Sequence, residues 1–126
     1  MLPVLHFWPV GHGTMNLFKS LKSSWYFGKG YKALKNQRYD QALRYFLFAL
    51  KYNQAAENSA ELAVLKEALA ETYLKLENFD EARLYATESI EIYETFYSKD
   101  KSDLFGKSVY RANKLLEKIS ERKMNC

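Results

Sequence analysis

A short sequence phrase, or motif, of four residues occurs twice in the chain in similar form. The two copies are Tyr39-Asp40-Gln41-Ala42 and Phe79-Asp80-Glu81-Ala82, which lie 40 positions apart. The same offset aligns further positions on both sides of the phrase: Gly30 with Ala70, Leu34 with Leu74, Tyr45 with Tyr85, and Leu50 with Ile90. Self-similarity at a period of 20–50 residues is the signature of stacked helical units. The sequence therefore predicts an array of helical repeats.

The rest of the sequence also favours helices. The two prolines are Pro3 and Pro9, and none of the five glycines lies between Lys32 and Phe105. Apolar residues recur at the helical period before and after each copy of the phrase. We expect helices at about 15–36, 39–57, 60–76, 79–97 and 103–123.

Short connections predict how these helices are arranged. Links of two or three residues, at 36–38 and 77–78, place the helices that they join antiparallel. Asn58 and Asn78 each precede a glutamate by three residues, which predicts helix caps at the starts of the third and fourth helices. The last helix has one apolar stripe and no later partner helix, so it is predicted to cap the array. Its stripe consists of Val109, Ala112, Leu116 and Ile119.

These residues resemble the tetratricopeptide repeat (TPR) family. Its small residue in the first helix is matched by Gly30 and Ala70, and its aromatic residue opening the second helix by Tyr39 and Phe79. The family alanine three residues later, which lets paired helices approach closely, is matched by Ala42 and Ala82. The period of 40 exceeds the 34 residues usual for the family. A period near 40 also fits HEAT-type repeats. We place the extra residues at Gln54–Ser59, where they would lengthen the helices, as in long-helix members of the family.

The resemblance implies an all-α fold, a short right-handed α-solenoid of two antiparallel helix pairs with a C-terminal capping helix. We expect repeats at about 24–57 and 60–97, a capping helix at about 103–123, and one domain over 15–123. Residues 1–14 are predicted to be a flexible extension. Overpacking at the small positions Ala42 or Ala82 would disturb this arrangement.

In that family one face of each first helix lines a concave groove, which implies a non-catalytic module that binds a peptide or a partner helix. The function implied is that of an adaptor or assembly factor. The groove residues carried over are Ser24, Phe27, Tyr31, Lys35, Val64, Glu67, Glu71 and Lys75. One half of this groove is aromatic and the other acidic, so we expect a protein or peptide partner with basic and apolar side chains. Because two repeats form a short array, we also consider a homo-oligomer.

A second reading concerns the basic and aromatic segment at the start of the first helix. Residues 1–38 carry a net charge of +6, residues 39–97 carry −6, and residues 98–126 carry +4. The favoured interpretation is a solvated basic face, with Phe18, Leu21 and Trp25 packing on the first repeat. The alternative is a protein that associates through this segment with a membrane surface or a nucleic acid.

Other classes of function find little support in the sequence. The single cysteine, Cys126, excludes an intrachain disulfide and favours a cytoplasmic location. Apolar runs are too short for a membrane span. His6 and His12 have no cysteine or acidic neighbour and make a poor metal site. No nucleophile stands beside a base and no phosphate-binding loop occurs, so we expect neither an enzyme nor a cofactor.

Overall fold

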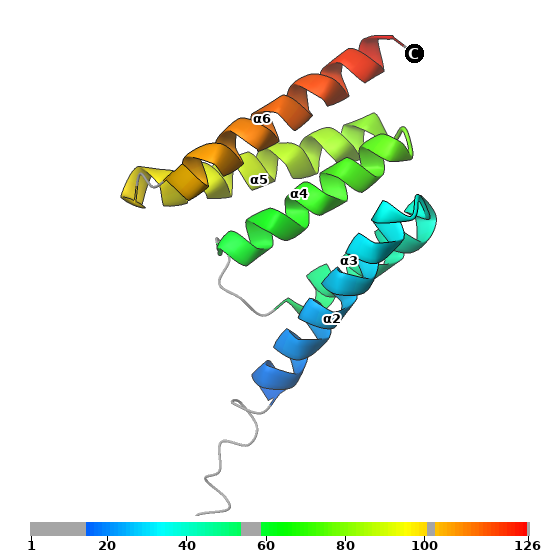
Figure 1. Ribbon diagram of the computed structural model, residues 1–126, viewed down its shortest axis with the longest axis vertical. Helices are drawn as coiled ribbons and strands as arrows, with labels where there is room; N and C mark the ends of the chain where they lie inside the picture. The colour runs from blue at the N-terminus through cyan, green and yellow to red at the C-terminus, as the bar shows by residue number, and fades with distance from the viewer. Residues whose placement is uncertain (1–14, 54–58, 101–102, 126) are drawn as a thin grey trace, which may run out of the picture.

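The computed structural model describes residues 15–53, 59–100 and 103–125, and this part of the chain is helical with no strand (Figure 1). The helices are α2 (Met15–Lys35), α3 (Tyr39–Tyr52), α4 (Ala60–Lys75), α5 (Phe79–Asp100) and α6 (Asp103–Met124). Helix α2 packs on α3, α4 packs on α5, and α6 lies along α5. The α2–α3 and α4–α5 pairs are antiparallel hairpins, so the all-α solenoid predicted from the repeat is confirmed.

One predicted helix boundary is wrong. Helix α3 ends at Tyr52 instead of residue 57, and Asn53 turns the backbone to an extended conformation with a ψ of 117°. Asparagine favours leaving a helix because its side chain competes for backbone hydrogen bonds. Residues 54–58 lie outside the described part, as does the cap predicted at Asn58. The cap of α4 is Ser59, whose hydroxyl accepts a hydrogen bond from the Leu62 amide at 3.1 Å.

Both hairpins turn through the same backbone geometry. Gln37 and Glu77, again 40 residues apart, adopt left-handed φ angles of 63° and 61°. The amide of Arg38 donates to the Ala33 carbonyl at 2.8 Å, and Gln37 donates to Leu34 at 3.0 Å. Asn78 and Glu77 repeat both bonds at the end of α4. These paired bonds form the Schellman motif, which satisfies the last carbonyls of a helix and reverses the chain.

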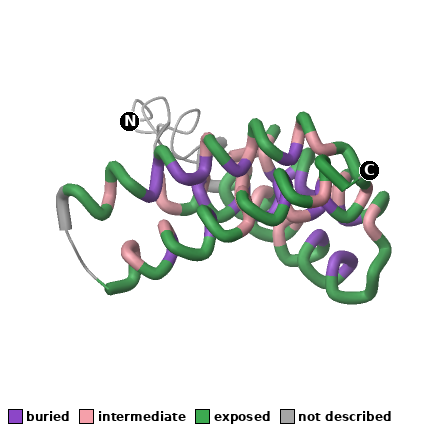
Figure 2. Tube along the Cα trace, turned by 90° about the horizontal axis from the view of Figure 1, so that it is seen from above, coloured by how far each residue is buried: buried purple, intermediate pink, exposed green. Residues whose placement is uncertain are grey.

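The small repeat positions lie where the helices meet. Ala42 and Ala82 are fully buried, as predicted. Gly30 is also buried, and the ring of Phe46 lies against it. At the equivalent positions of the second hairpin, Ala70 and Ala86 share one core cluster. Figure 2 shows that the buried residues follow the lines of contact between helices.

Each hairpin also contains one hydrogen bond between its two helices. The Ser23 hydroxyl of α2 donates to the Ala49 carbonyl of α3 at 2.8 Å. The Ser89 hydroxyl of α5 donates to the Ala63 carbonyl of α4, also at 2.8 Å. An offset of 40 maps Ser23 onto Ala63 and Ala49 onto Ser89. The two hairpins thus use the same pair of positions with the serine on opposite helices.

Helix α6 packs through the apolar stripe predicted for it. Ala112 and Ile119 are buried, and Val109 and Leu116 pack against the core clusters that α4 and α5 form. The side-chain amide of Asn113 donates a hydrogen bond to the Val109 carbonyl one turn earlier. The last helix therefore covers the apolar side of the second hairpin.

The favoured interpretation of the N-terminal stripe is wrong. Phe18, Leu21 and Trp25 do not pack on the first repeat, because 58%, 57% and 57% of their surfaces are exposed. Another side of α2 enters the core instead, through Gly30, Ala33 and Leu34. Only one face of a helix can pack against its hairpin partner. In α2 that face consists of these core positions.

Candidate functional site

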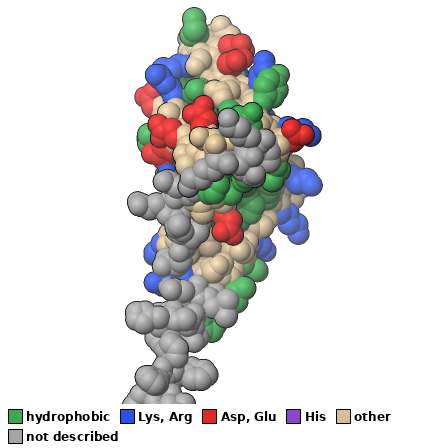
Figure 3. All heavy atoms as spheres, turned by 90° about the vertical axis from the view of Figure 1, so that its left-hand side faces the viewer, with side chains coloured by type: hydrophobic (Ala, Val, Ile, Leu, Met, Phe, Trp, Pro, Cys, Tyr) green, Lys and Arg blue, Asp and Glu red, His purple; other side chains and the backbone are tan. Residues whose placement is uncertain are grey.

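Two adjoining cavities run between α2 and α4. The first has a volume of about 250 Å³ and the second about 340 Å³. Both are lined by Phe27 of α2 and Val64 of α4, so they form one continuous depression, which we name the α2–α4 cleft. Figure 3 shows hydrophobic side chains gathered at mid-height, at the level where the two hairpins meet.

The structure brings most of the predicted groove residues together in this cleft. Six of the eight line one or both cavities: Ser24, Phe27, Tyr31, Val64, Glu67 and Glu71. Lys35 and Lys75, in the last turns of their helices, line neither of the two. The spacing of three and four residues places each set on one side of its helix, which is why the sequence could group them.

Other residues of the cleft were not predicted. On α2 and α4 they continue the same faces, and the helical period could have found them: Ser20, Ser23, Glu61, Leu65 and Ala68. Asn53 enters at the end of α3. Arg111 comes from α6, and no periodicity links α6 to the cleft. Its position depends on how the capping helix packs.

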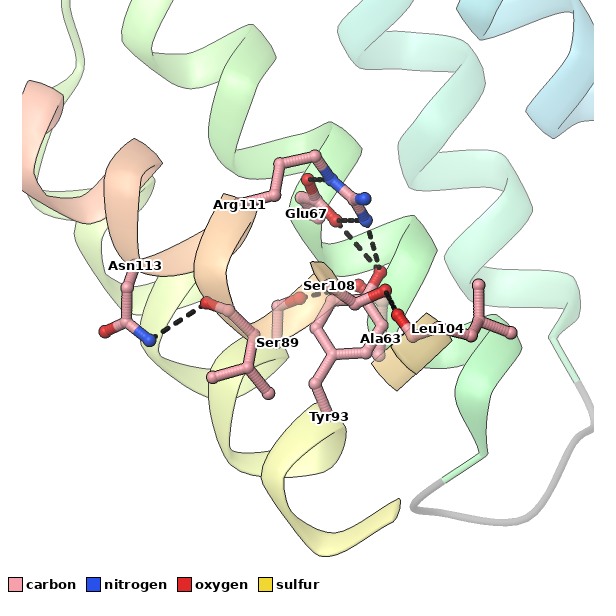
Figure 4. A network of polar contacts seen from close by, with 9 residues as sticks. Ala63, Glu67, Ser89, Tyr93, Leu104, Ser108, Arg111 and Asn113 are labelled. Carbon is pink, nitrogen blue, oxygen red and sulfur yellow. Dashed lines mark hydrogen bonds and ion pairs between the residues drawn. The ribbon is translucent and has the colours of Figure 1, made fainter. Parts of the chain in front are cut away.

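A polar network joins three helices at the second cavity (Figure 4). The Arg111 guanidinium of α6 donates to both carboxylate oxygens of Glu67 on α4, at 2.6 Å from Nε and 2.8 Å from Nη2. The Tyr93 hydroxyl of α5 donates to Glu67 Oε1 at 2.9 Å. Only 15% of the Glu67 side chain is exposed, against 55% for Arg111. The bidentate geometry is the strong form of an arginine–carboxylate pair.

The network shifts the pKa values of Tyr93 and Arg111. Burial, and then the negative charge of Glu67, raises the pKa of the Tyr93 hydroxyl well above its ordinary value. The hydrogen bond to Glu67 raises the pKa of the Arg111 guanidinium. Tyr93 is therefore neutral and Arg111 charged at physiological pH. The arrangement holds a compensated carboxylate, which suits a structural clamp between α4, α5 and α6.

This pairing changes the charge expected along the cleft. Glu67 and Arg111 neutralise each other, whereas Glu61 and Glu71 make no ion pair within the described part of the chain. Glu61 lies at the first cavity and Glu71 at the second. The acidic character predicted for α4 thus resides at two separated carboxylates with apolar Val64 between them.

Among the described residues, no cluster of three or more histidine, cysteine, aspartate or glutamate side chains could hold a metal ion. Likewise, no helix of residues 15–53, 59–100 and 103–125 has the length and hydropathy to cross a membrane. His6, His12 and the extension predicted at 1–14 lie outside the described residues.

Comparison with known proteins agrees with the repeat geometry. The family model described as the tetratricopeptide repeat matches residues 25–95, which spans both hairpins and more than half of the chain. No curated protein matches the chain in sequence. The matched region contains the two Schellman turns, the buried Ala42 and Ala82, and the α2 and α4 residues that line the second cavity. The chain belongs to the tetratricopeptide repeat family.

Proposed function

We propose that the chain is a non-catalytic interaction module, an adaptor or assembly factor that binds a peptide or a partner helix in the α2–α4 cleft. Tetratricopeptide repeats generally bind proteins or peptides. The observation that carries the proposal is the cleft itself, where apolar side chains remain open to solvent between two unpaired carboxylates. Apolar surface with a few placed polar groups is the usual composition of a binding site.

Two side chains are the expected anchors. Tyr31 is 48% exposed and Val64 is 40% exposed, although both line the second cavity. The ring of Phe27 meets that of Tyr31 edge to face at 5.5 Å, so the Tyr31 ring is held by a neighbour. Aromatic side chains that are already ordered lose little entropy on binding and often dominate an interface.

The two free carboxylates define the partner more closely. Glu61 and Glu71 are ten positions apart on α4, a rise of about 15 Å along the helix. A partner that contacts both carries basic side chains about that far apart with apolar side chains between them. An extended peptide spans this distance in about five residues and a helix in about ten. The proposed ligand is therefore a basic–apolar–basic segment.

Panning a library of random displayed peptides on the full chain tests the proposal. Selected peptides are expected to share the basic–apolar–basic pattern. Tyr31→Ala and Glu71→Lys should each weaken a selected peptide by about tenfold or more. The matched control is Glu94→Lys, an exposed glutamate on α5, which should leave the affinity unchanged. Glu67 is unsuitable as a test position because its replacement would leave Arg111 without its partner.

Selected peptides without a common basic pattern, or equal losses for Glu71→Lys and Glu94→Lys, would remove the cleft from consideration. We also propose a cytoplasmic location, as predicted from the single cysteine. A homo-oligomer stays a prediction, which sedimentation over a range of concentrations would test.

A further inference from the structure

Helix α2 carries a second exposed surface, distinct from the face that packs on α3. We name it the α2 outer face, and its members are Phe18, Leu21, Lys22, Trp25, Lys29 and Lys32, all of them exposed. Steps of three, four and seven residues place them on one side of the helix. The cleft residues Ser24, Phe27 and Tyr31 lie on another side, so the two surfaces are distinct.

The repeat shows what the α2 outer face corresponds to. An offset of 40 maps Trp25, Lys29 and Lys32 onto Leu65, Leu69 and Thr72 of α4. These three are buried, and the two leucines share a core cluster with Phe46 and Ala49 of α3. In α4 this face thus receives the preceding helix pair. In α2 the equivalent face is the open end of the described solenoid.

The open end is not shaped for another helix pair or for a second copy stacked on it. Such packing would bury Lys29 and Lys32 where α4 buries Leu69 and Thr72, and buried ammonium groups are costly without partners. Lysines at an end face keep a solenoid soluble. Solubility alone, however, does not call for Phe18, Leu21 and Trp25 on the same face, each more than half exposed.

The charge around this face is of one sign. Residues 15–39 contain no acidic side chain, and the α2–α3 range 15–53 holds eight basic side chains and one acidic. The α4–α5 range 59–98 holds three basic and nine acidic. In Figure 3 most of the visible acidic side chains accordingly lie in the upper part of the molecule. The lysines of the outer face make no ion pair within the described residues.

The lysines and the rings of this region form a single mixed surface. Lys29 Nζ lies 5.3 Å from the centre of the Trp25 ring, and Lys22 Nζ lies 5.0 Å from the centre of the Tyr52 ring. Tryptophan, phenylalanine and leucine flanked by lysine is the composition that rests at the boundary between lipid headgroups and acyl chains. Long lysine side chains can reach the headgroups while the rings enter the boundary.

We propose that the α2 outer face binds the surface of an anionic lipid bilayer. Phe18, Leu21 and Trp25 enter the headgroup boundary, and Lys22, Lys29 and Lys32 contact the anionic headgroups. A nucleic acid would contact the lysines and stack on Phe18 and Trp25, but it would leave Leu21 in water. The apolar stripe therefore favours lipid. Binding here leaves the α2–α4 cleft open, so a cleft ligand could be held at the membrane.

Tryptophan fluorescence gives a direct test, because the chain has two tryptophans, Trp8 and Trp25. The full chain with Trp8→Phe reports on Trp25 alone, and the full chain with Trp25→Phe reports on Trp8 alone. Each is titrated with phosphatidylcholine vesicles containing about 30% phosphatidylserine and with phosphatidylcholine vesicles alone. We expect a blue shift of Trp25 emission with the anionic vesicles only. Raising NaCl from about 0.05 to about 0.5 M should reverse it.

Charge reversal then locates the binding surface. Lys22→Glu, Lys29→Glu and Lys32→Glu together should lower the vesicle partition coefficient by about 100-fold, at roughly fivefold for each lysine. The matched control reverses three exposed lysines of α6, Lys107, Lys114 and Lys118, and should retain most of the binding. A conservative set with glutamine at the three α2 positions should give an intermediate loss. Helical circular dichroism is compared for every variant.

Three results would overturn the proposal. The first is a blue shift of Trp8 with none of Trp25, which would assign binding to the segment before α2. The second is an equal loss for the α2 and α6 reversals, which would reduce the effect to net charge. The third is binding of a fluorescein-labelled single-stranded oligonucleotide without binding of the vesicles. Tyr31→Ala should leave vesicle binding intact, which separates this surface from the proposed peptide cleft.

Discussion

The ring of Phe46 occupies the space that a side chain at Gly30 would need. A Cβ placed on Gly30 would lie 2.7 Å from two carbons of that ring, well inside van der Waals contact. The equivalent positions in the second hairpin hold Ala70 and Ala86. One hairpin therefore combines the smallest residue with a large one, and the other combines two small ones.

Gly30→Ala should lower the free energy of unfolding by about 1–3 kcal/mol, because the added methyl overpacks against Phe46. Gly28→Ala is the control, since nothing lies within 4 Å of a Cβ there, and it should raise stability by about 0.5–1 kcal/mol through helix propensity. Urea unfolding measures both. In a Phe46→Ala background, Gly30→Ala should no longer destabilise. A loss of equal size in both backgrounds would show that the two residues are not coupled.

Gln37→Gly should stabilise the chain by about 0.5–1 kcal/mol, because Gln37 holds a left-handed φ of 63° that favours glycine. Thermal unfolding provides the measurement. Asn36→Gly, one position earlier and outside the left-handed region, is the control and should be neutral or destabilising. A gain at position 36 as large as at position 37 would argue against relief of backbone strain.

Arg111→Ala should destabilise the chain by about 1–3 kcal/mol, since it leaves the largely buried Glu67 carboxylate with Tyr93 as its remaining partner. Arg122→Ala is the control, because its contact to Glu77 is 3.6 Å long and exposed, and should change stability by less than about 0.5 kcal/mol. Chemical unfolding compares the two. Combining Arg111→Ala with Glu67→Gln should recover part of the loss, and no recovery would mean that the charge on Glu67 is not the cause.

Tyr93→Phe should alter the stability of the chain at alkaline pH. The pKa of Tyr93 is higher in the folded state than its ordinary value of 10.0, so its stabilising contribution is complete below about pH 10 and declines above it. Between pH 10 and the folded pKa, the unfolded state releases a proton that the folded state retains. In the Tyr93→Phe variant the free energy of unfolding should therefore fall less steeply with pH in this range. The slopes of the two proteins should differ by about 1.4 kcal/mol per pH unit. Unfolding free energies measured over this range would show equal slopes if Tyr93 did not contribute.

Much of the fold could be predicted because local signals and packing agree. Ala42 and Ala82 stand at equivalent repeat positions, and their burial follows from the close approach of paired helices. The end of α3 at Tyr52 was missed, since no proline or glycine marks it and Asn53 is only a weak stop signal. The left-handed turns at Gln37 and Glu77 were also missed, because neither residue type is typical of that conformation.

The residues of the cleft were predictable only where spacing within a single helix places them on one face. Phe27, Tyr31, Val64 and Glu71 follow from spacing along α2 and α4. The pairing of Glu67 with Arg111 joins residues 44 positions apart and depends on the placement of α6, which no periodicity encodes. The exposure of Trp25 was misjudged because α2 has apolar residues on two sides. Composition alone could not tell which side its hairpin partner covers.

The exchanged serines at Ser23 and Ser89 bear on attempts to build longer arrays from this chain. An average taken position by position would treat 23 and 63 as one column, and 49 and 89 as another, and could return two alanines or two serines opposite each other. Two alanines would lose the bridge between helices, and two serines would bury a hydroxyl in need of another acceptor. The feature that the two hairpins share is a serine–alanine pair across the interface between their helices. A designer should therefore copy the two positions of the pair together and not average each position separately.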